Sequence, residues 1–159
     1  MEWILISNAT TGIREYHLLQ GDRVMIVLKY SLEQQSVRIA FDNEHQVFFL
    51  ENMGYANRIA FKNAYGVDQG KFSHNNRSNS GRLEINHAVY DYNIVDTNQP
   101  KLIIHQHNKQ EPLAVCQIPA IPTRESAVYE QACMVLSVCW FTKMPASPQK
   151  TESVQPDNN

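Results

Sequence analysis

The feature that most constrains the fold is an apolar run near the end of the chain, from Ala127 to Phe141. Glu130 and Gln131 lie near its start, and the ten residues that follow contain a single polar side chain, Ser137. A helix on the surface of a soluble protein carries a polar face along its whole length, and this segment has none. It must therefore be surrounded either by other parts of the protein or by lipid.

Protein explains the run better than lipid. A membrane-spanning helix needs about 20 apolar residues, whereas a ten-residue helical core is only about 15 Å long. Glu130 would also cost several kcal/mol inside a bilayer. We therefore expect no transmembrane span. A window widened to Ala127–Met144 reaches 18 residues, which leaves a marginal tail anchor as the alternative.

The first 118 residues alternate between apolar and polar side chains, which predicts strands that are wet on one face. In Ser36–Asp42, for example, Val37, Ile39 and Phe41 face one way. The even positions of Arg23–Tyr30 are apolar in the same manner, beginning with Val24. Turn residues recur every 8–12 residues or so, a spacing typical of an antiparallel barrel or sandwich. About ten strands are predicted before residue 119.

The turns carry two further expectations. Gly66 follows Tyr65 between two predicted strands, where a tight hairpin needs a positive φ. The segment His74–Gly81 is polar throughout and predicts a long surface loop. Such a loop is either a plain connection or a binding segment carried on a rigid barrel.

Together these patterns predict a mainly β fold: a closed antiparallel barrel of ten or more strands around a central hydrophobic C-terminal helix. The helix is expected from Arg124 to about Lys143, with Thr123 as its N-cap and Pro145 ending it. A barrel this wide cannot be filled by its own strand side chains, so the helix would fill it. Residues 1–143 form the expected domain, and the polar residues 144–159 are expected to be a disordered tail.

This order of elements resembles the tubby C-terminal-like superfamily, which includes tubby domains, plant LURP-one-related proteins and phospholipid scramblases. The segment 61–72, with its Tyr65-Gly66 turn, resembles the strand–Tyr-Gly–strand hairpins of that group, and Ala132–Phe141 resembles its central helix. The resemblance covers residues 2 to about 143. It implies a closed barrel of about 12 strands around a buried helix and a function connected with lipids, such as phosphoinositide binding.

Composition narrows the function classes. The net charge is −2 and the sequence pI is about 6.3, without the basic stripe of a nucleic-acid-binding protein. Cys116, Cys133 and Cys139 show no C-x-x-C spacing, so we expect reduced, buried thiols. The N-terminus lacks the basic region of a signal peptide. A cytoplasmic location is therefore expected, peripheral to a membrane if the lipid hypothesis holds.

Five cations lie in and around the segments that flank the Tyr65-Gly66 turn. They are Arg58, Lys62, Lys71, Arg77 and Arg82. Gathered on one surface, they could hold a phosphate headgroup through charge-assisted hydrogen bonds. The alternative is a mixed solvated surface, because Glu51, Asp68 and Glu84 are equally close in sequence.

A second candidate site is the pair His105 and His107. Two positions apart on a strand, their side chains point the same way and could share a metal ion, with Asp91 or Cys116 as a third ligand. The alternative is two polar residues on the barrel exterior. A third candidate is a ligand cavity lined by aromatic residues, for which a packed core is the alternative. These residues are Tyr16, Tyr30, Phe48, Phe49, Tyr90, Tyr92 and Trp140.

No catalytic motif is identifiable. The chain has no G-x-S-x-G, no G-x-G phosphate loop and no recognisable Ser-His-Asp order, and no cofactor is expected. The leading hypothesis is a non-enzymatic module that binds an anionic lipid or a protein partner. The alternatives are a carrier of small apolar ligands, which would need an empty lumen, and a metal-dependent enzyme using His105 and His107. The oligomeric state stays open.

Overall fold

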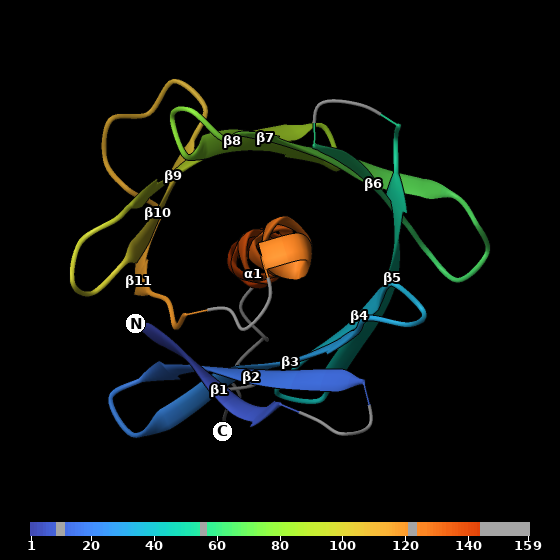
Figure 1. Ribbon diagram of the computed structural model, residues 1–159, viewed down its shortest axis with the longest axis horizontal. Coiled ribbons are helices and arrows are strands. Elements are labelled where there is room, and N and C mark those ends of the chain that lie inside the picture. Colours follow the sequence, from blue (N-terminus) through green and yellow to red (C-terminus); the bar gives the residue numbers. More distant parts are fainter. Residues whose placement is uncertain (9–11, 55–56, 121–123, 144–159) are drawn as a thin grey trace, which may run out of the picture.

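The computed structural model describes residues 1–8, 12–54, 57–120 and 124–143. In this part of the chain eleven strands and one helix are present (Figure 1). They are β1 (Glu2–Asn8), β2 (Ile13–Gln20), β3 (Arg23–Ser31), β4 (Ser36–Phe41), β5 (Glu44–Asn52), β6 (Arg58–Lys62), β7 (Asp68–Asn75), β8 (Ser80–Ile85), β9 (Ala88–Val95), β10 (Lys101–Gln106), β11 (Ala114–Gln117) and α1 (Arg124–Lys143).

The strands form a closed barrel in which each strand pairs with the next one along the chain. Every consecutive pair is antiparallel, but β1 and β11 meet in parallel. This follows from the odd number of strands, because the first and last members of an alternating series of eleven run in the same direction. The parallel contact is short, with Glu2 and Gln117 as its Cα partners. The predicted fold class is thus confirmed, with eleven strands where about 12 were expected.

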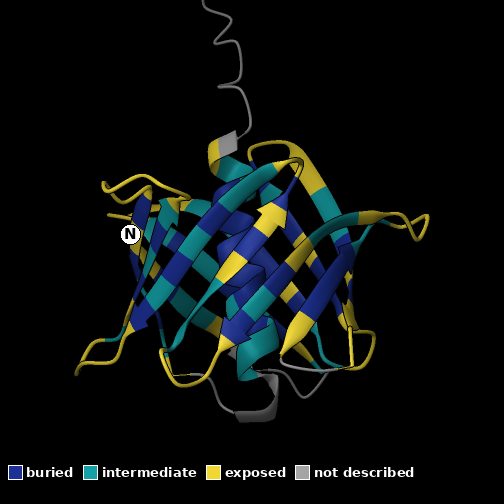
Figure 2. Ribbon diagram, turned by 90° about the horizontal axis from the view of Figure 1, so that it is seen from above, coloured by how far each residue is buried: buried dark blue, intermediate teal, exposed yellow. Residues whose placement is uncertain are grey.

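Helix α1 runs through the middle of the barrel, surrounded by strands (Figures 1 and 2). The segment 132–139 is buried throughout. Its one polar side chain, Ser137, donates a hydrogen bond to the backbone oxygen of Cys133 at 2.6 Å, so its hydroxyl is satisfied within the helix. Near the helix C-terminus, Trp140 and Phe141 pack edge-on against Phe41 at centroid distances of 4.9 and 4.8 Å. At about 2 kcal/mol for each buried apolar side chain, this burial is a large stabilising contribution.

The predicted start and end of the helix match α1, while Thr123 and Pro145 lie outside the described residues, as does the predicted tail 144–159. Among the described residues, no helix has both the length and the hydropathy required to cross a membrane.

Strand alternation holds for most of the barrel and fails in β3. Val37, Ile39 and Phe41 are buried, as predicted. Val24 was expected on the same face as Ile26, but it is 46 % exposed. The pairing of β2 with β3 shifts here, since Leu18 pairs with Ile26 and Leu19 with Val24. One extra residue, Met25, therefore bulges out of the strand and reverses the phase of everything before it.

The predicted long loop His74–Gly81 is wrong in extent. His74 belongs to β7 and Gly81 to β8, so residues 76–79 alone connect the two strands. Gly81 is required where it lies, because a Cβ there would be 2.0 Å from the Ser73 backbone oxygen and 2.6 Å from the Tyr92 hydroxyl. The Tyr92 ring stacks on the buried His74 imidazole, and the Tyr92 hydroxyl is hydrogen-bonded to His74 Nδ1. Burial lowers the pKa of His74.

The prediction for the Tyr65-Gly66 turn holds. Gly66 has a φ of +79°, and the side-chain oxygen of Asn63 accepts hydrogen bonds from the backbone N–H groups of Tyr65 and Val67 at 2.9 and 3.0 Å. The side chain of Asn63 thus stabilises the turn between β6 and β7.

Among the described residues, one ion pair lies inside the barrel. Glu130 of α1 is fully buried, and it accepts hydrogen bonds from the guanidinium of Arg14 and the hydroxyl of Tyr16, both in β2. Burial and the bond to Glu130 raise the pKa of Tyr16 far above its ordinary value. The carboxylate is thus paired rather than wet. The two strand residues fix the position of the helix within the lumen.

The three cysteines are free and buried, as predicted. Burial raises the pKa of the Cys116 thiol to about 11. Most of the aromatic set belongs to the core: Tyr16, Tyr30, Phe48, Tyr90 and Tyr92 are buried. Phe49 differs, since it lies on the exterior with 40 % of its surface exposed. Packed core is therefore the correct interpretation of these aromatic residues, because α1 occupies the space that a ligand would need.

Candidate functional site

Three of the five predicted cations gather on the outer surface of three neighbouring strands. Arg58 of β6 pairs in register with Ser73 of β7, which pairs in turn with Arg82 of β8. Lys71 lies two residues from Ser73 on the same face of β7. The inward positions beside these residues are held by apolar side chains, Ile59, Phe72 and Leu83, so strand alternation turns the cations outward. We refer to Arg58, Lys71 and Arg82 as the β6–β8 cation cluster.

The β6–β8 cation cluster surrounds a shallow hollow of about 320 Å³. Its lining residues are Met53, Arg58, Lys71, Phe72, Ser73, Arg82 and Glu84. Three cations therefore share the hollow with one carboxylate, Glu84. Met53 adds an apolar side chain that is 38 % exposed. This composition suits a group that carries negative charge and an apolar body.

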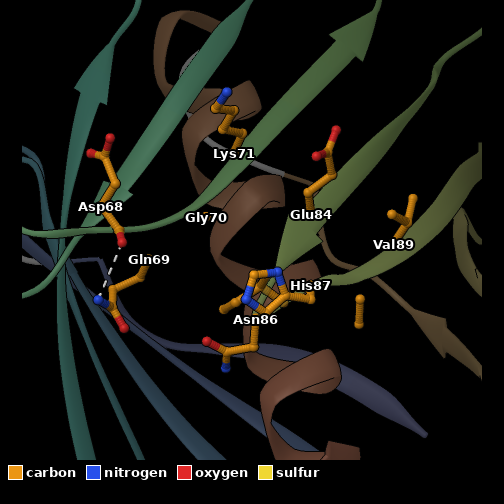
Figure 3. Close-up of a pocket in the computed structure, with 10 residues that line it drawn as sticks. Asp68, Gln69, Gly70, Lys71, Glu84, Asn86, His87 and Val89 are labelled. Carbon is orange, nitrogen blue, oxygen red and sulfur yellow. Dashed lines mark hydrogen bonds between the residues drawn. The ribbon is translucent and has the colours of Figure 1, made fainter.

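A second hollow, of about 430 Å³, adjoins the first around the tight β8–β9 turn (Figure 3). Lys71 and Glu84 line both hollows and extend from neighbouring strands, where they are Cα partners. Asp68 and His87 also line the second hollow. The second hollow has two carboxylates beside one lysine, so it is less favourable for binding an anion than the first hollow. We therefore assign the site to the first.

The other two predicted cations do not join the cluster. Lys62 lies on β6 but binds Glu51, with an Nζ–Oε1 distance of 2.8 Å, and Asp68 is 3.9 Å away. The hydrogen bond to Glu51 raises the pKa of Lys62. Arg77 lies in the exposed β7–β8 turn, where its backbone N–H binds the Asn75 side chain at 2.9 Å, and it does not line the hollow.

Arg82 is itself part of a group of three charged or titratable side chains. Its Nε donates to Oδ1 of Asp91 at 2.9 Å, and the second oxygen of Asp91 contacts Nδ1 of His107 at 2.7 Å. Burial raises the pKa of Asp91, but the hydrogen bonds from His107 and Arg82 outweigh it and leave the pKa below its usual value. Asp91 is therefore a carboxylate with both oxygens engaged.

This arrangement is not apparent from the sequence. From the sequence alone, Asp91 is only a possible third metal ligand beside the two histidines. Residues 82, 91 and 107 are far apart along the chain, and the register of β8, β9 and β10 brings them together.

The predicted metal pair lies at the end of β10. His105 lies on β10 as the Cα partner of Asp91, whereas His107 lies just beyond the end of that strand. Cys116 is fully buried on the opposite face of the barrel wall, so it cannot act as the third ligand. Within the described ranges, no group of three or more His, Cys, Asp or Glu residues could hold a metal ion.

Comparison with protein-family models, with curated proteins and with solved structures finds no match to this chain.

Proposed function

We propose that this protein is a non-enzymatic binding module whose β6–β8 cation cluster holds the headgroup of an anionic phospholipid. The observation that carries the proposal is the gathering of Arg58, Lys71 and Arg82 around one hollow that contains a single carboxylate. On this proposal the protein is cytoplasmic and associates with the membrane surface.

The chemistry of the lining residues fits a phosphate. Guanidinium groups can donate two parallel hydrogen bonds to phosphate oxygens, and lysine adds a flexible point charge. Each cation near an anionic bilayer contributes about 1 kcal/mol. Met53, exposed at the edge of the hollow, can contact the glycerol and upper acyl carbons.

The architecture gives a second line of support. A barrel around a hydrophobic C-terminal helix is the order of elements on which we propose membership of the tubby C-terminal-like superfamily. Lipid recognition is the role which that resemblance implies. The two arguments are independent, because one rests on the order of elements and the other on the charges of the outer surface.

The other two hypotheses lack such support. A carrier of apolar ligands needs an empty lumen, and α1 fills the lumen with buried side chains. An enzyme using His105 and His107 needs further ligands. Of the two third ligands considered from sequence, Cys116 faces the interior, and Asp91 is already hydrogen-bonded to Arg82.

Vesicle sedimentation tests the proposal. The unmodified protein should sediment with phosphatidylglycerol vesicles and not with phosphatidylcholine vesicles. The double variant Arg58→Glu/Lys71→Glu should lose at least about tenfold in affinity, because two favourable charges become unfavourable.

The matched control is Lys29→Glu/Arg38→Glu, which makes the same change in net charge on β3 and β4, strands that β5 separates from the cluster (Figure 1). Both control residues are exposed. Equal losses in the two double variants would show that net charge alone drives binding. Absence of sedimentation in the unmodified protein would overturn the proposal.

A further inference from the structure

Arg82, one of the three cations in the cluster, has a counter-anion built into the fold. Its Nε–Asp91 Oδ1 distance of 2.9 Å is that of a charge-assisted hydrogen bond. Both side chains are on the surface, with 48 % of Arg82 and 38 % of Asp91 exposed. Arg82 therefore reaches the hollow while part of its hydrogen-bonding capacity is already used.

His107 holds this counter-anion in place. Its Nδ1 lies 2.7 Å from Oδ2 of Asp91 and 3.5 Å from an Nη atom of Arg82. Since Oδ1 binds Arg82 and Oδ2 contacts His107, the carboxylate is fixed between β8 and the end of β10 rather than free to turn into solvent. The carboxylate that lines the hollow, Glu84, has no such contact with Arg82 among the described hydrogen bonds and ion pairs.

We infer that Asp91 is an internal competitor for Arg82, so that an anionic ligand of the β6–β8 cation cluster must displace this carboxylate to gain the full binding of the guanidinium. The inference rests on the proposed function, since it describes how the affinity of that same site is set. Binding to a phosphate exchanges one ion pair of Arg82 for another, and the net gain is smaller than that from an unpaired arginine.

The test is a double-mutant cycle on the full chain, with phosphatidylglycerol vesicles as the probe. Asp91→Asn keeps the shape of the side chain and removes the competing charge. It should tighten binding about fivefold, the equivalent of one added cation near an anionic surface. In the Arg82→Gln background the same substitution should produce no gain, because the group it releases is absent.

Asp22→Asn is the matched control, because it makes the same change in net charge in the exposed β2–β3 turn, across the barrel from the site (Figure 1). It should leave the affinity within about twofold of the unmodified protein. All the substituted residues are surface residues, so circular dichroism should show an unchanged fold.

Three outcomes would overturn the inference while leaving the proposed function standing. The first is weaker binding by Asp91→Asn, which would show that the carboxylate positions Arg82 for the ligand. The second is a gain in vesicle affinity from Asp91→Asn that persists in the Arg82→Gln background. The third is an equal gain in vesicle affinity from Asp22→Asn. Failure of both the unmodified protein and Asp91→Asn to bind these vesicles would instead overturn the proposed function itself.

Discussion

The molecule contains two ion pairs of similar chemistry in opposite environments. Inside the barrel, Arg14 and Glu130 are 8 % and 0 % exposed, and Tyr16 completes the hydrogen bonding of the carboxylate. Outside, Arg82 and Asp91 are 48 % and 38 % exposed, and His107 contacts the second oxygen of the Asp91 carboxylate. Among the described contacts, each carboxylate binds an arginine and a second donor. What differs is the access of water, and this decides whether a pair contributes to the fold or is available to a ligand.

The interior pair should show the largest effect when it is broken. Glu130→Leu leaves the Arg14 guanidinium buried without its carboxylate, and such a change typically costs about 3–5 kcal/mol. Chemical denaturation monitored by tryptophan fluorescence measures the loss. The double variant Arg14→Met/Glu130→Leu should recover most of it, because neither charge is then buried. A loss below about 1 kcal/mol in the single variant would contradict the contrast between the two pairs.

Thiol reactivity tests the seclusion of the interior at a second point. Cys133 lies one turn from Glu130, and its pKa is raised well above the ordinary value by burial and then by that carboxylate. Since the thiolate is the reactive form, all three cysteines should resist an aqueous disulfide reagent in the native protein and react fully once it is unfolded. Rapid labelling of even one thiol in the native protein would show that water reaches the helix.

The exterior pair should contribute little to stability. Asp91→Asn is expected to lower the free energy of unfolding by less than about 1 kcal/mol, and by less still in high salt. The pKa of Asp91 is depressed in the folded state, so its small contribution is present above the unfolded-state pKa and is lost as the pH falls through the folded-state pKa. The denaturation curves of the variant and the unmodified protein should therefore differ slightly at neutral pH and converge at acidic pH. A large loss at neutral pH that salt does not reduce would place this pair with the interior one.

The smallest effect is expected at Lys62. Its charge is already matched by Glu51 at 2.8 Å, and it does not line the hollow. Lys62→Gln should change vesicle affinity by less than about twofold, although it removes a cation from the same strand as Arg58. A loss equal to that of Lys71→Gln would mean that the cluster is wider than the three residues assigned to it.

The sequence was sufficient to predict the barrel and its helix, because both depend on patterns that are local. The unbroken apolar run Ala132–Phe141 requires burial on all sides, and alternation in segments such as Ser36–Phe41 requires a half-wet sheet. The phase error at Val24 has an equally local cause, a bulge at Met25 that leaves no mark on composition.

The candidate site depends on register, which accumulates over many strands and cannot be obtained from single segments. Lys62 and Lys71 look equivalent in the sequence. The pairing of β5, β6 and β7 places Lys62 beside two carboxylates and leaves Lys71 at the hollow. In the same way, Asp91 and His107 meet across the β9–β10 pair, which their positions in the chain do not suggest.

The barrel is closed by a short parallel contact between β1 and β11, and this has a consequence for how the protein folds during synthesis. The wall is complete only when strands from opposite ends of the eleven-strand series meet, and the helix that fills it follows all eleven strands along the chain. Until the helix is synthesised, the cylinder has nothing to pack around, and its inward side chains stay in contact with water. The barrel can therefore be completed only after Lys143 has been synthesised. Until then the apolar faces and unpaired edges of the nascent strands are exposed to aggregation.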